Sequence, residues 1–342
     1  MSIEETIIVR RMPFVKAVAT SLRQQCGVEP GDRLLIAVSG GGDSVALMRA
    51  LVALGGTPEW DLDLHIAHIQ HHLRDDAEAD AAFVEALAAQ FGMPLHRRDV
   101  TIDTAAGNVE AEARKLRYRA LADIAGAIDA DAVAAAHHAD DQLETILMRL
   151  LRGAALRGLS GMAVRRRLGT GRLIRPMLDC TRSEAVGFLE QIDQPWRDDH
   201  TNTDIARWRA RLRADVLPVL MELRADAPGK ANQAAQRLRA ADELLALLTR
   251  RLERRHVSLT DDGSATLGRD VARKMQPELL GRVIQRQCRK AGVSADQISM
   301  RLIDAIGGAV RDGSGERRTF DLAGGCVVEV SSEAIVWRGG SA

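Results

Sequence analysis

The amino-acid sequence predicts an α/β fold: a parallel-sheet domain with helices on both faces, followed by a smaller, mainly helical domain with short terminal strands. Short strand-like segments alternate with longer helical patterns up to about residue 200, which is typical of a parallel sheet. From about residue 203 onward, helical patterns follow one another directly. The length of 342 residues suits two domains. We therefore expect domains at 1–225 and 226–342.

The elements of the first domain follow from hydrophobic periodicity. Strands are expected at 34–39, 64–69, 95–100, 132–137 and 172–178, and helices at 44–54, 75–92, 108–128 and 141–153. Thr181 and Glu184 form a capping box that begins a further helix. Ligands of such folds bind beyond the carboxyl ends of the strands. Three polar segments, 39–44, 68–74 and 137–141, should therefore share one rim of the sheet.

The second domain is expected to be built mainly from helices. Helical patterns cover 203–224, 231–256, 270–291 and 295–311, and residues 226–230 separate the first two. The segment from 317 to 338 resembles short strands around the Gly324–Gly325 turn.

Composition narrows the class of protein. Hydrophobic residues make up 46% of the chain and charged residues 27%, which is ordinary for a soluble globular protein. No run of about 18 apolar residues is present to span a membrane, and the N-terminus lacks the apolar segment of a secretory signal. The four cysteines are far apart and form no CxxC pair, so neither a disulfide framework nor a structural zinc site is predicted. We expect a cytoplasmic protein with no membrane partner.

The charge distribution leaves a nucleic-acid partner open. The formal net charge is zero, but residues 146–224 contain fifteen arginines, no lysine and nine acidic residues. Arginine makes planar, bidentate contacts with phosphate, so this segment could bind RNA. A solvated, arginine-rich helical face explains the same composition equally well.

The stretch Ser39-Gly-Gly-Gly-Asp-Ser44 follows the first expected strand and leads directly into a helix. It lacks the lysine of a P-loop and the spacing of the GxGxxG motif. Glycines 40–42 leave backbone N–H groups open, and a helix N-terminus with two neighbouring hydroxyls favours an anion. Asp43 beside a phosphate suggests bound Mg²⁺. A tight turn without a ligand is the alternative.

Acidic residues begin the helix after the fourth strand. Asp141 and Glu144 are three positions apart and share a helix face, while Asp140 suits an N-cap. The pair could hold Mg²⁺ or a substrate ammonium, or could simply be a favourable acidic first turn. Of His137 and His138, one is expected to face the ligand. The arginines 74, 114 and 117 are candidates for phosphate contacts, although for the last two a solvated helix face is as plausible.

The SGGxDS pattern resembles the pyrophosphate loop of the N-type ATP pyrophosphatases, and further segments resemble one family of these enzymes, the tRNA(Ile)-lysidine synthetases. The matching segments are HIQHHLRDDAEAD at 68–80, NVEAEARKLRYRAL at 108–121, HHADDQLETILMRLLRGAALRGLSGM at 137–162, IRPML at 174–178 and WRDDHTNTD at 196–204. They cover most of residues 33–220 in the family's order and spacing.

The resemblance implies an ATP-dependent C–N ligase. Such an enzyme adenylates the wobble cytidine in the CAU anticodon of isoleucine tRNA, joins free L-lysine to its carbon 2 and releases AMP and pyrophosphate. The product, lysidine, changes codon reading from AUG to AUA. ATP, Mg²⁺, L-lysine and this tRNA are the implied ligands, and family members often form homodimers.

The resemblance also implies roles for individual residues. Catalysis is assigned to Asp43, Asp141, Glu144 and Arg209, and a Mg²⁺ site to Asp43. ATP and pyrophosphate contacts fall on Ser39, Gly40, Gly41, Gly42, Asp43, Ser44 and His68. Lysine binding falls on His137, Asp141 and Glu144, and tRNA binding on Arg114, Arg117, Arg209, Arg211 and Arg213.

The chain departs from the family pattern at three positions. Ala155 replaces a glycine, His72 replaces a common glycine, and Ala210 replaces the asparagine of an RNxxR segment. The second C-terminal module of longer members is expected to be absent.

Two alternatives to lysidine synthesis remain. The chain could be another pyrophosphate-loop enzyme, a tRNA thiolase or an amidating synthetase. Thiolases of this group need reactive cysteines, often CxxC, and amidating members need a glutamine-hydrolysing partner. The chain could also be a nucleotide- or RNA-binding protein without catalysis, which would release no pyrophosphate.

Overall fold

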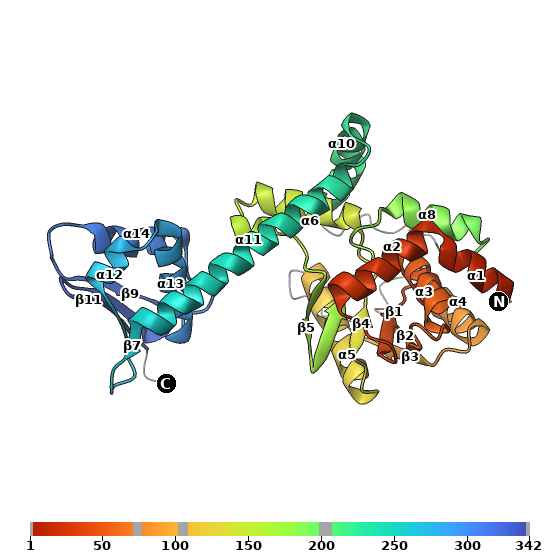
Figure 1. The fold of residues 1–342 in the computed structure, drawn as a ribbon, viewed down its shortest axis with the longest axis horizontal. Coiled ribbons are helices and arrows are strands. Elements are labelled where there is room, and N and C mark those ends of the chain that lie inside the picture. Colours follow the sequence, from red (N-terminus) through yellow and green to blue (C-terminus); the bar gives the residue numbers. More distant parts are fainter. Residues whose placement is uncertain (1–2, 71–76, 102–108, 198–206, 340–342) are drawn as a thin grey trace. The chain divides into compact units, whose positions relative to one another are not determined.

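A computed structural model describes residues 3–70, 77–101, 109–197 and 207–339 (Figure 1). The chain divides into two compact units, Met1–Leu238 and Arg239–Ala342. The division falls within helix α11 (Ala227–His256). The expected division of roles at residue 225, a catalytic part before it and an RNA-binding part after it, stays a prediction.

The first unit contains a six-stranded sheet in the order β3-β2-β1-β4-β6-β5. The strands are β1 Arg33–Ala37, β2 Asp63–Gln70, β3 Leu95–Asp99, β4 Ala132–Ala134, β5 Arg165–Leu168 and β6 Gly171–Ile174. All neighbouring pairs are parallel except β5 with β6. The expected parallel sheet is confirmed, whereas β5 was missed because its Arg-Arg-Arg run does not resemble a strand.

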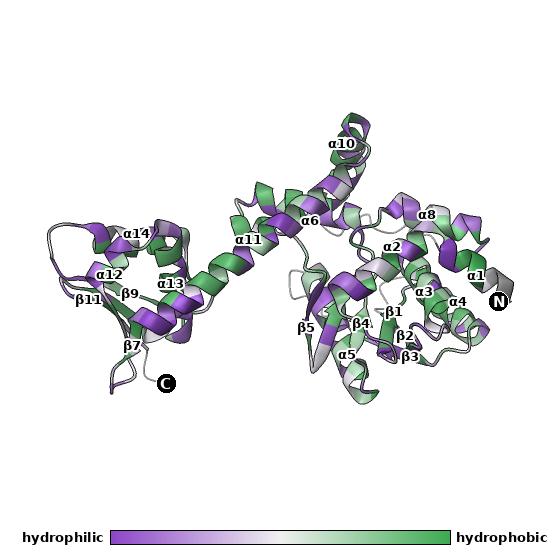
Figure 2. Ribbon diagram, viewed as in Figure 1, coloured by the Kyte–Doolittle hydropathy of each residue, from purple (hydrophilic) through white to green (hydrophobic). Residues whose placement is uncertain are grey.

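Both faces of this sheet are covered, which explains the continuous apolar run in β1. Leu34 and Ile36 pack into a core that also contains residues of α3 (Gly42–Gly55), while Leu35 packs into a second core with Leu121 of α5 (Val109–Ala127). A strand buried on both sides needs apolar side chains at every position. The edge strands β3 and β5 are hydrophilic (Figure 2). Charged edges discourage pairing with other chains.

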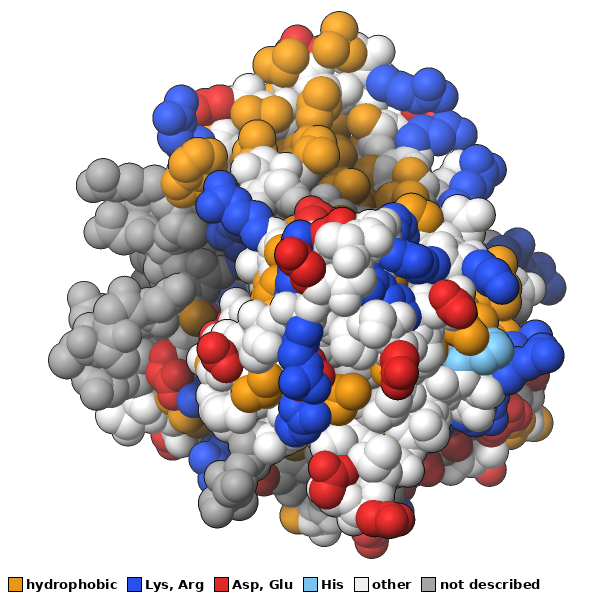
Figure 3. Space-filling model, turned by 90° about the vertical axis from the view of Figure 1, so that its left-hand side faces the viewer, with side chains coloured by type: hydrophobic (Ala, Val, Ile, Leu, Met, Phe, Trp, Pro, Cys, Tyr) orange, Lys and Arg blue, Asp and Glu red, His pale blue; other side chains and the backbone are white. Residues whose placement is uncertain are grey.

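The helices of the first unit are α1 Ile3–Arg11, α2 Pro13–Ser21, α3 Gly42–Gly55, α4 Ala77–Gln90, α5 Val109–Ala127, α6 Ala139–Leu151, α7 Leu156–Leu159, α8 Arg182–Gln191, α9 Arg207–Arg211 and α10 Leu217–Leu223. Short π-helical segments, η1 Leu22–Cys26 and η3 Leu212–Val216, continue α2 and α9. The helix expected at 203–224 therefore consists, in its described part, of three consecutive segments. Val219 and Leu223 of α10 are exposed, and Figure 3 shows hydrophobic side chains gathered at the top of that view, where α10 lies.

The expected break between the two helices is present, but it lies at residues 224–226 and not at 226–230, because α11 begins at Ala227 and includes Pro228 in its first turn. Proline is tolerated there, since the first-turn N–H groups have no helical partner. The start of α11 is attached to the first unit by polar contacts. Asn232, almost fully buried, donates to Asp179 at 2.7 Å and accepts from Gln142 at 3.0 Å.

The second unit contains a five-stranded antiparallel sheet in the order β7-β8-β11-β10-β9. Its strands are β7 Val257–Leu259, β8 Ala265–Gly268, β9 Arg318–Asp321, β10 Val327–Val330 and β11 Ala334–Arg338, and a short 3₁₀ turn, η4 (Ala323–Gly325), precedes β10. The helices α12 Arg269–Lys274, α13 Pro277–Lys290 and α14 Met300–Arg311 complete it. The terminal strands are confirmed, and β7 and β8 are additional. The helix expected at 270–291 is interrupted because Pro277 begins a new one.

None of the helices in the described part of the chain is long and apolar enough to cross a membrane.

Candidate active site

The glycine-rich turn lies between β1 and α3, at the carboxyl end of a central strand. Two hydroxyls fix its backbone. Ser44 Oγ donates to the Gly41 carbonyl at 2.8 Å and accepts the Ser39 N–H at 3.2 Å, and the two hydroxyl oxygens are 3.2 Å apart. The turn therefore has a defined shape without a ligand.

Geometry requires one of the three glycines and leaves little room for a side chain at a second. Gly40 has φ +94°, which is strained for any residue with a side chain. A Cβ at Gly42 would lie 3.3 Å from the Trp196 ring. Gly41 is the N-cap of α3 and makes no side-chain capping bond. The first N–H groups of α3 can therefore bind an anion.

The segment around Trp196 and Arg197 was not expected beside this turn. The Arg197 N–H donates to the Gly40 carbonyl at 3.0 Å, and Gly41 and Arg197 form a parallel bridge. The Arg197 side chain forms an ion pair with Asp80 of α4. The only sequence signal was the WRDD segment that resembles the family.

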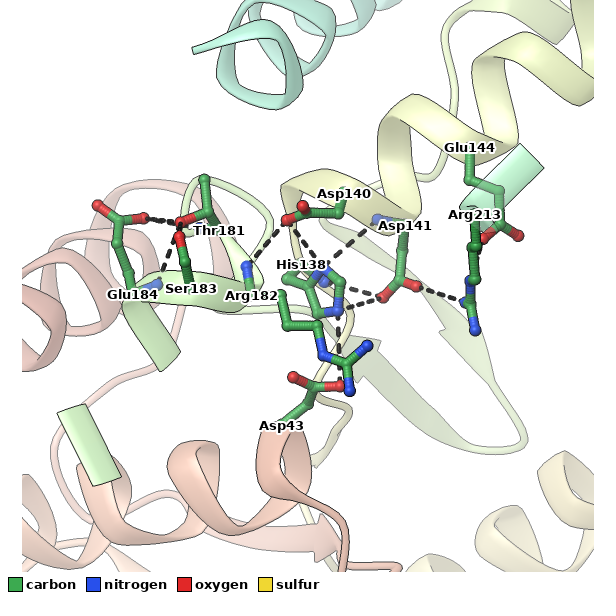
Figure 4. A network of polar contacts seen from close by, with 10 residues as sticks. All are labelled: Asp43, His138, Asp140, Asp141, Glu144, Thr181, Arg182, Ser183, Glu184 and Arg213. Atoms are coloured by element: carbon green, nitrogen blue, oxygen red, sulfur yellow. Dashed lines mark hydrogen bonds and ion pairs between the residues drawn. The ribbon is translucent and has the colours of Figure 1, made fainter. Parts of the chain in front are cut away.

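A second helix N-terminus carries three of the acidic residues near the turn (Figure 4). His138 is the N-cap of α6, and its backbone N–H donates to Asp141 Oδ2 at 3.2 Å. Its ring Nε2 lies 3.5 Å from Asp43 Oδ2, at the start of α3, and 3.5 Å from Asp141 Oδ2. Nδ1 lies 3.3 Å from Asp140 Oδ2. His138 therefore links the two helix N-termini.

The charge of His138 follows from these neighbours. Burial by itself lowers the pKa of the ring, but Asp140, Asp43 and Asp141 outweigh burial and raise the pKa to about 10. The protonated ring cannot accept the Asp141 N–H, which lies 3.4 Å from Nδ1. We regard the contact with Asp140 as the one that Nδ1 makes at neutral pH.

Asp141 and Glu144 do share one helix face, and arginines from the α9–η3 segment neutralise them. Glu144, almost fully buried, accepts from Arg213 Nε at 2.6 Å and lies 2.9 Å from Arg209 Nε. Asp141 Oδ1 lies 3.2 Å from Arg213 (Figure 4). These ion pairs with Arg209 and Arg213 were not predicted, because both arginines were expected to contact RNA or phosphate. The catalytic roles of Asp141, Glu144 and Arg209 stay predictions.

Other candidate residues lie apart from this group. His68 is buried, and its Nδ1 lies 2.9 Å from the Val38 carbonyl, so the ring supports the strand end that leads into the turn. Arg211 is exposed and pairs with Asp215. Arg74, together with His71 and His72, lies outside the described residues.

His137 has different surroundings from His138. Burial, followed by the charges of Arg175 and Arg114, lowers its pKa well below the ordinary value of 6.5. Its Nδ1 is buried without a hydrogen-bond partner among the described residues. Cationic neighbours oppose binding of an ammonium at this ring. The expected lysine site at His137, Asp141 and Glu144 stays a prediction.

The magnesium expectation rests on Asp43. No group of three metal-ligating side chains occurs within the described ranges. Mg²⁺, however, commonly takes one or two carboxylates and completes its shell with phosphates and water. Asp43 Oδ1 is buried and makes no hydrogen bond to the described residues, at the same helix N-terminus that suits an anion. The residues present fit such an ion.

Two departures from the family pattern are accommodated by the backbone. Ala155 has φ −82° and ψ −170°, an extended conformation that needs no glycine. Ala210 lies within α9, where alanine is favourable. The third departure, His72, lies outside the described residues.

A family profile described as the PP-loop domain matches residues 14–220. Curated relatives are named tRNA(Ile)-lysidine synthase. The relative from Geobacter sulfurreducens is 38% identical over 81% of this chain and 59% of its own length. The relative from Symbiobacterium thermophilum is 41% identical over 70% of this chain and 50% of its own length. That of Salinispora arenicola is 33% identical over 92% of this chain and 93% of its own length. The chain thus spans only half to three-fifths of the first two relatives.

Among solved structures, the U34-tRNA thiolase NcsA from Methanococcus maripaludis, with its [4Fe-4S] cluster, has a similar fold. The TM-score is 0.57 at 14% identity, over 69% of this chain and 80% of that one. This likeness concerns the fold alone.

Proposed function

This chain belongs to the tRNA(Ile)-lysidine synthase family of PP-loop proteins, and from that premise we propose that it joins L-lysine to the wobble cytidine of isoleucine tRNA at the expense of ATP. The main support is the match to a relative over 92% of this chain and 93% of that relative, together with the convergence of Asp43, His138, Asp141 and Glu144 at one rim of the sheet. RNA, lysine and ATP are its proposed substrates.

In the first step, ATP binds over the turn with its β- and γ-phosphates on the glycine amides, Ser39 and Ser44. The carbon-2 oxygen of the cytidine attacks the α-phosphate, the bond to the β-phosphate breaks, and pyrophosphate leaves. The N-terminus of α3 stabilises the negative charge of the phosphates. Mg²⁺ held by Asp43 would neutralise part of this charge when bound. Positioning and charge neutralisation supply most of the catalysis.

In the second step, the lysine ε-amine attacks carbon 2. The new C–N bond forms, the C–O bond to the phosphate breaks, and AMP leaves. The amine must lose a proton to attack, and in this proposal Asp141 or Glu144 accepts it. In the structure these carboxylates are paired with Arg213 and Arg209. A lysine ammonium carries the same charge as a guanidinium, so the pair can accept it in place of Arg213.

The thiolase alternative is less well supported. All four cysteines are buried. Burial raises the pKa of Cys26 to about 11 and that of Cys180 to about 12. Sulfur transfer and cluster binding use accessible thiolates, which these environments disfavour.

The test is incorporation of radiolabelled lysine into isoleucine tRNA with a CAU anticodon, with and without ATP, and with methionine tRNA as the control. We expect label only in the isoleucine tRNA and only with ATP. Pyrophosphate release with another RNA, but no lysine incorporation, would retain the ATP chemistry and reject the substrate. No pyrophosphate release with any RNA would favour a binding protein without catalysis.

A further inference from the structure

A second cluster of polar groups lies away from the glycine-rich turn, around Tyr118 of α5. The Arg114 guanidinium lies 5.1 Å from the Tyr118 ring centre, and that of Arg166, from β5, lies 4.5 Å from it. Arg114 Nη2 also donates to the Tyr118 hydroxyl at 3.2 Å. Both arginines are exposed, so their guanidinium groups can reach a ligand in solvent.

Two further nitrogen atoms of this cluster are buried and unpartnered. Arg175 directly follows β6 and is only 3% exposed, and its Nε makes no hydrogen bond to the described residues. His137 follows β4, the neighbour of β6, and its buried Nδ1 likewise makes none. Buried polar groups are nearly always hydrogen-bonded in native proteins. The Arg175 Nε–H is always a donor, so it indicates a missing acceptor, and His137 Nδ1 can donate to the same ligand in the tautomer that protonates it.

The positive charge of this cluster is not neutralised by the described part of the protein. No carboxylate of a described residue forms an ion pair with Arg114, Arg166 or Arg175. Burial lowers the pKa of Arg175, and repulsion from Arg166 and Arg114 lowers it further, although Tyr118 acts in the opposite direction. Arg175 Nη1 donates to the Ala163 carbonyl at 2.6 Å, but this neutral acceptor does not balance the charge. A buried charge without a counter-charge is costly, and binding an anion would offset that cost.

We propose that Arg114, Tyr118, Arg166, Arg175 and His137 form a phosphate-binding site distinct from the glycine-rich turn. Guanidinium groups suit a phosphate because their parallel N–H donors match its oxygens. The phosphate comes either from an RNA backbone or from a nucleotide or pyrophosphate. An RNA source rests on the proposed function, whereas the site itself does not.

The experiment measures binding to the full chain with two probes, pyrophosphate by calorimetry and an anticodon stem-loop RNA by filter binding at several salt concentrations. The variants are Arg166→Gln and Arg114→Gln, which change exposed side chains. Arg167→Gln is the matched control, because successive side chains of a strand point to opposite faces. Circular dichroism verifies that each variant is folded.

We expect Arg166→Gln and Arg114→Gln to weaken binding of at least one probe by about tenfold or more, because each removes a charge-assisted hydrogen bond. If only RNA binding is weakened, and the slope of log affinity against log salt concentration becomes shallower by about one, the phosphate belongs to RNA. Loss for pyrophosphate assigns it to a nucleotide. Arg167→Gln should change binding by no more than about twofold, as expected for a surface charge.

The proposal is overturned if both variants bind both probes as tightly as the wild type. It is also overturned if Arg167→Gln loses as much affinity as Arg166→Gln, because the edge strand would then act only as a general basic surface. The outcome is separable from the proposed function. If binding depends on Arg166 but the protein incorporates no lysine, this site is retained and lysidine synthesis is rejected. If the protein incorporates lysine but binding does not depend on Arg166, only this site is rejected.

Discussion

The pairing of Glu144 with Arg213 and Arg209 provides a quantitative test of how the acidic helix face is stabilised. Removing one partner of a fully buried ion pair costs roughly 3–5 kcal/mol. Glu144 has a side chain 4% exposed, but those of Arg213 and Arg209 are 47% and 32% exposed, so solvent screens part of the charge left behind. We therefore expect Glu144→Gln to destabilise the first unit by about 2 kcal/mol.

A double-mutant cycle isolates the pair. Combining Glu144→Gln with Arg213→Gln should destabilise the protein by less than the sum of the single changes, with a coupling of about 1–2 kcal/mol. The control is Arg211→Gln. Arg211 lies two residues away and has a side chain 81% exposed, and it should show almost no coupling to Glu144.

Hydrogen exchange measured by mass spectrometry gives the local free energy of opening. Peptides from α6 should exchange faster in Glu144→Gln, and peptides from residues 239–342 provide an internal reference because no changed residue lies there. A coupling below about 0.5 kcal/mol would refute the reasoning, since that is the range found for independent sites.

Three further predictions concern the same unit. Gly40→Ala should destabilise the first unit by about 1–2 kcal/mol and lower the rate of pyrophosphate release, because the backbone at residue 40 has φ +94°. Thermal melting measures the first effect and the release assay the second. A variant that melts at the wild-type temperature would contradict the prediction. Thr181→Ala should lower the free energy of unfolding by about 1 kcal/mol, because it removes the capping box with Glu184. Urea unfolding measures this loss, and an unchanged midpoint would contradict it. The pKa of His138 is raised to about 10, so its contribution to stability is complete below pH 6.5, the ordinary histidine pKa, and is lost as the pH rises towards 10. Between pH 6.5 and 10, the urea midpoint of the wild type should fall more steeply with pH than that of His138→Gln. Equal slopes of midpoint against pH would show that His138 is not protonated in the folded protein.

Much of the fold is encoded locally, which explains why the sequence predicts it. Alternating strand and helix patterns predicted the parallel sheet, and the apolar run at 34–39 predicted its first strand. The elements that were missed have unusual composition. β5 consists mostly of arginines, and Pro228 suggested a break where it in fact lies in the first turn of α11. Local propensity is overridden there by pairing and by position within the helix.

The site shows the same division between local and tertiary information. By itself, the sequence determined the glycine-rich turn, because backbone φ angles and helix capping depend on neighbouring residues. It also placed Asp141 and Glu144 on one face of a helix, because residues three apart lie on the same side of the helical repeat. Only the tertiary structure decided that His138 joins Asp43 to α6, that Arg213 neutralises Glu144, and that Arg166 and Arg175 meet at Tyr118. These contacts join segments tens of residues apart. They form only when the sheet brings those segments together, and no local periodicity specifies them.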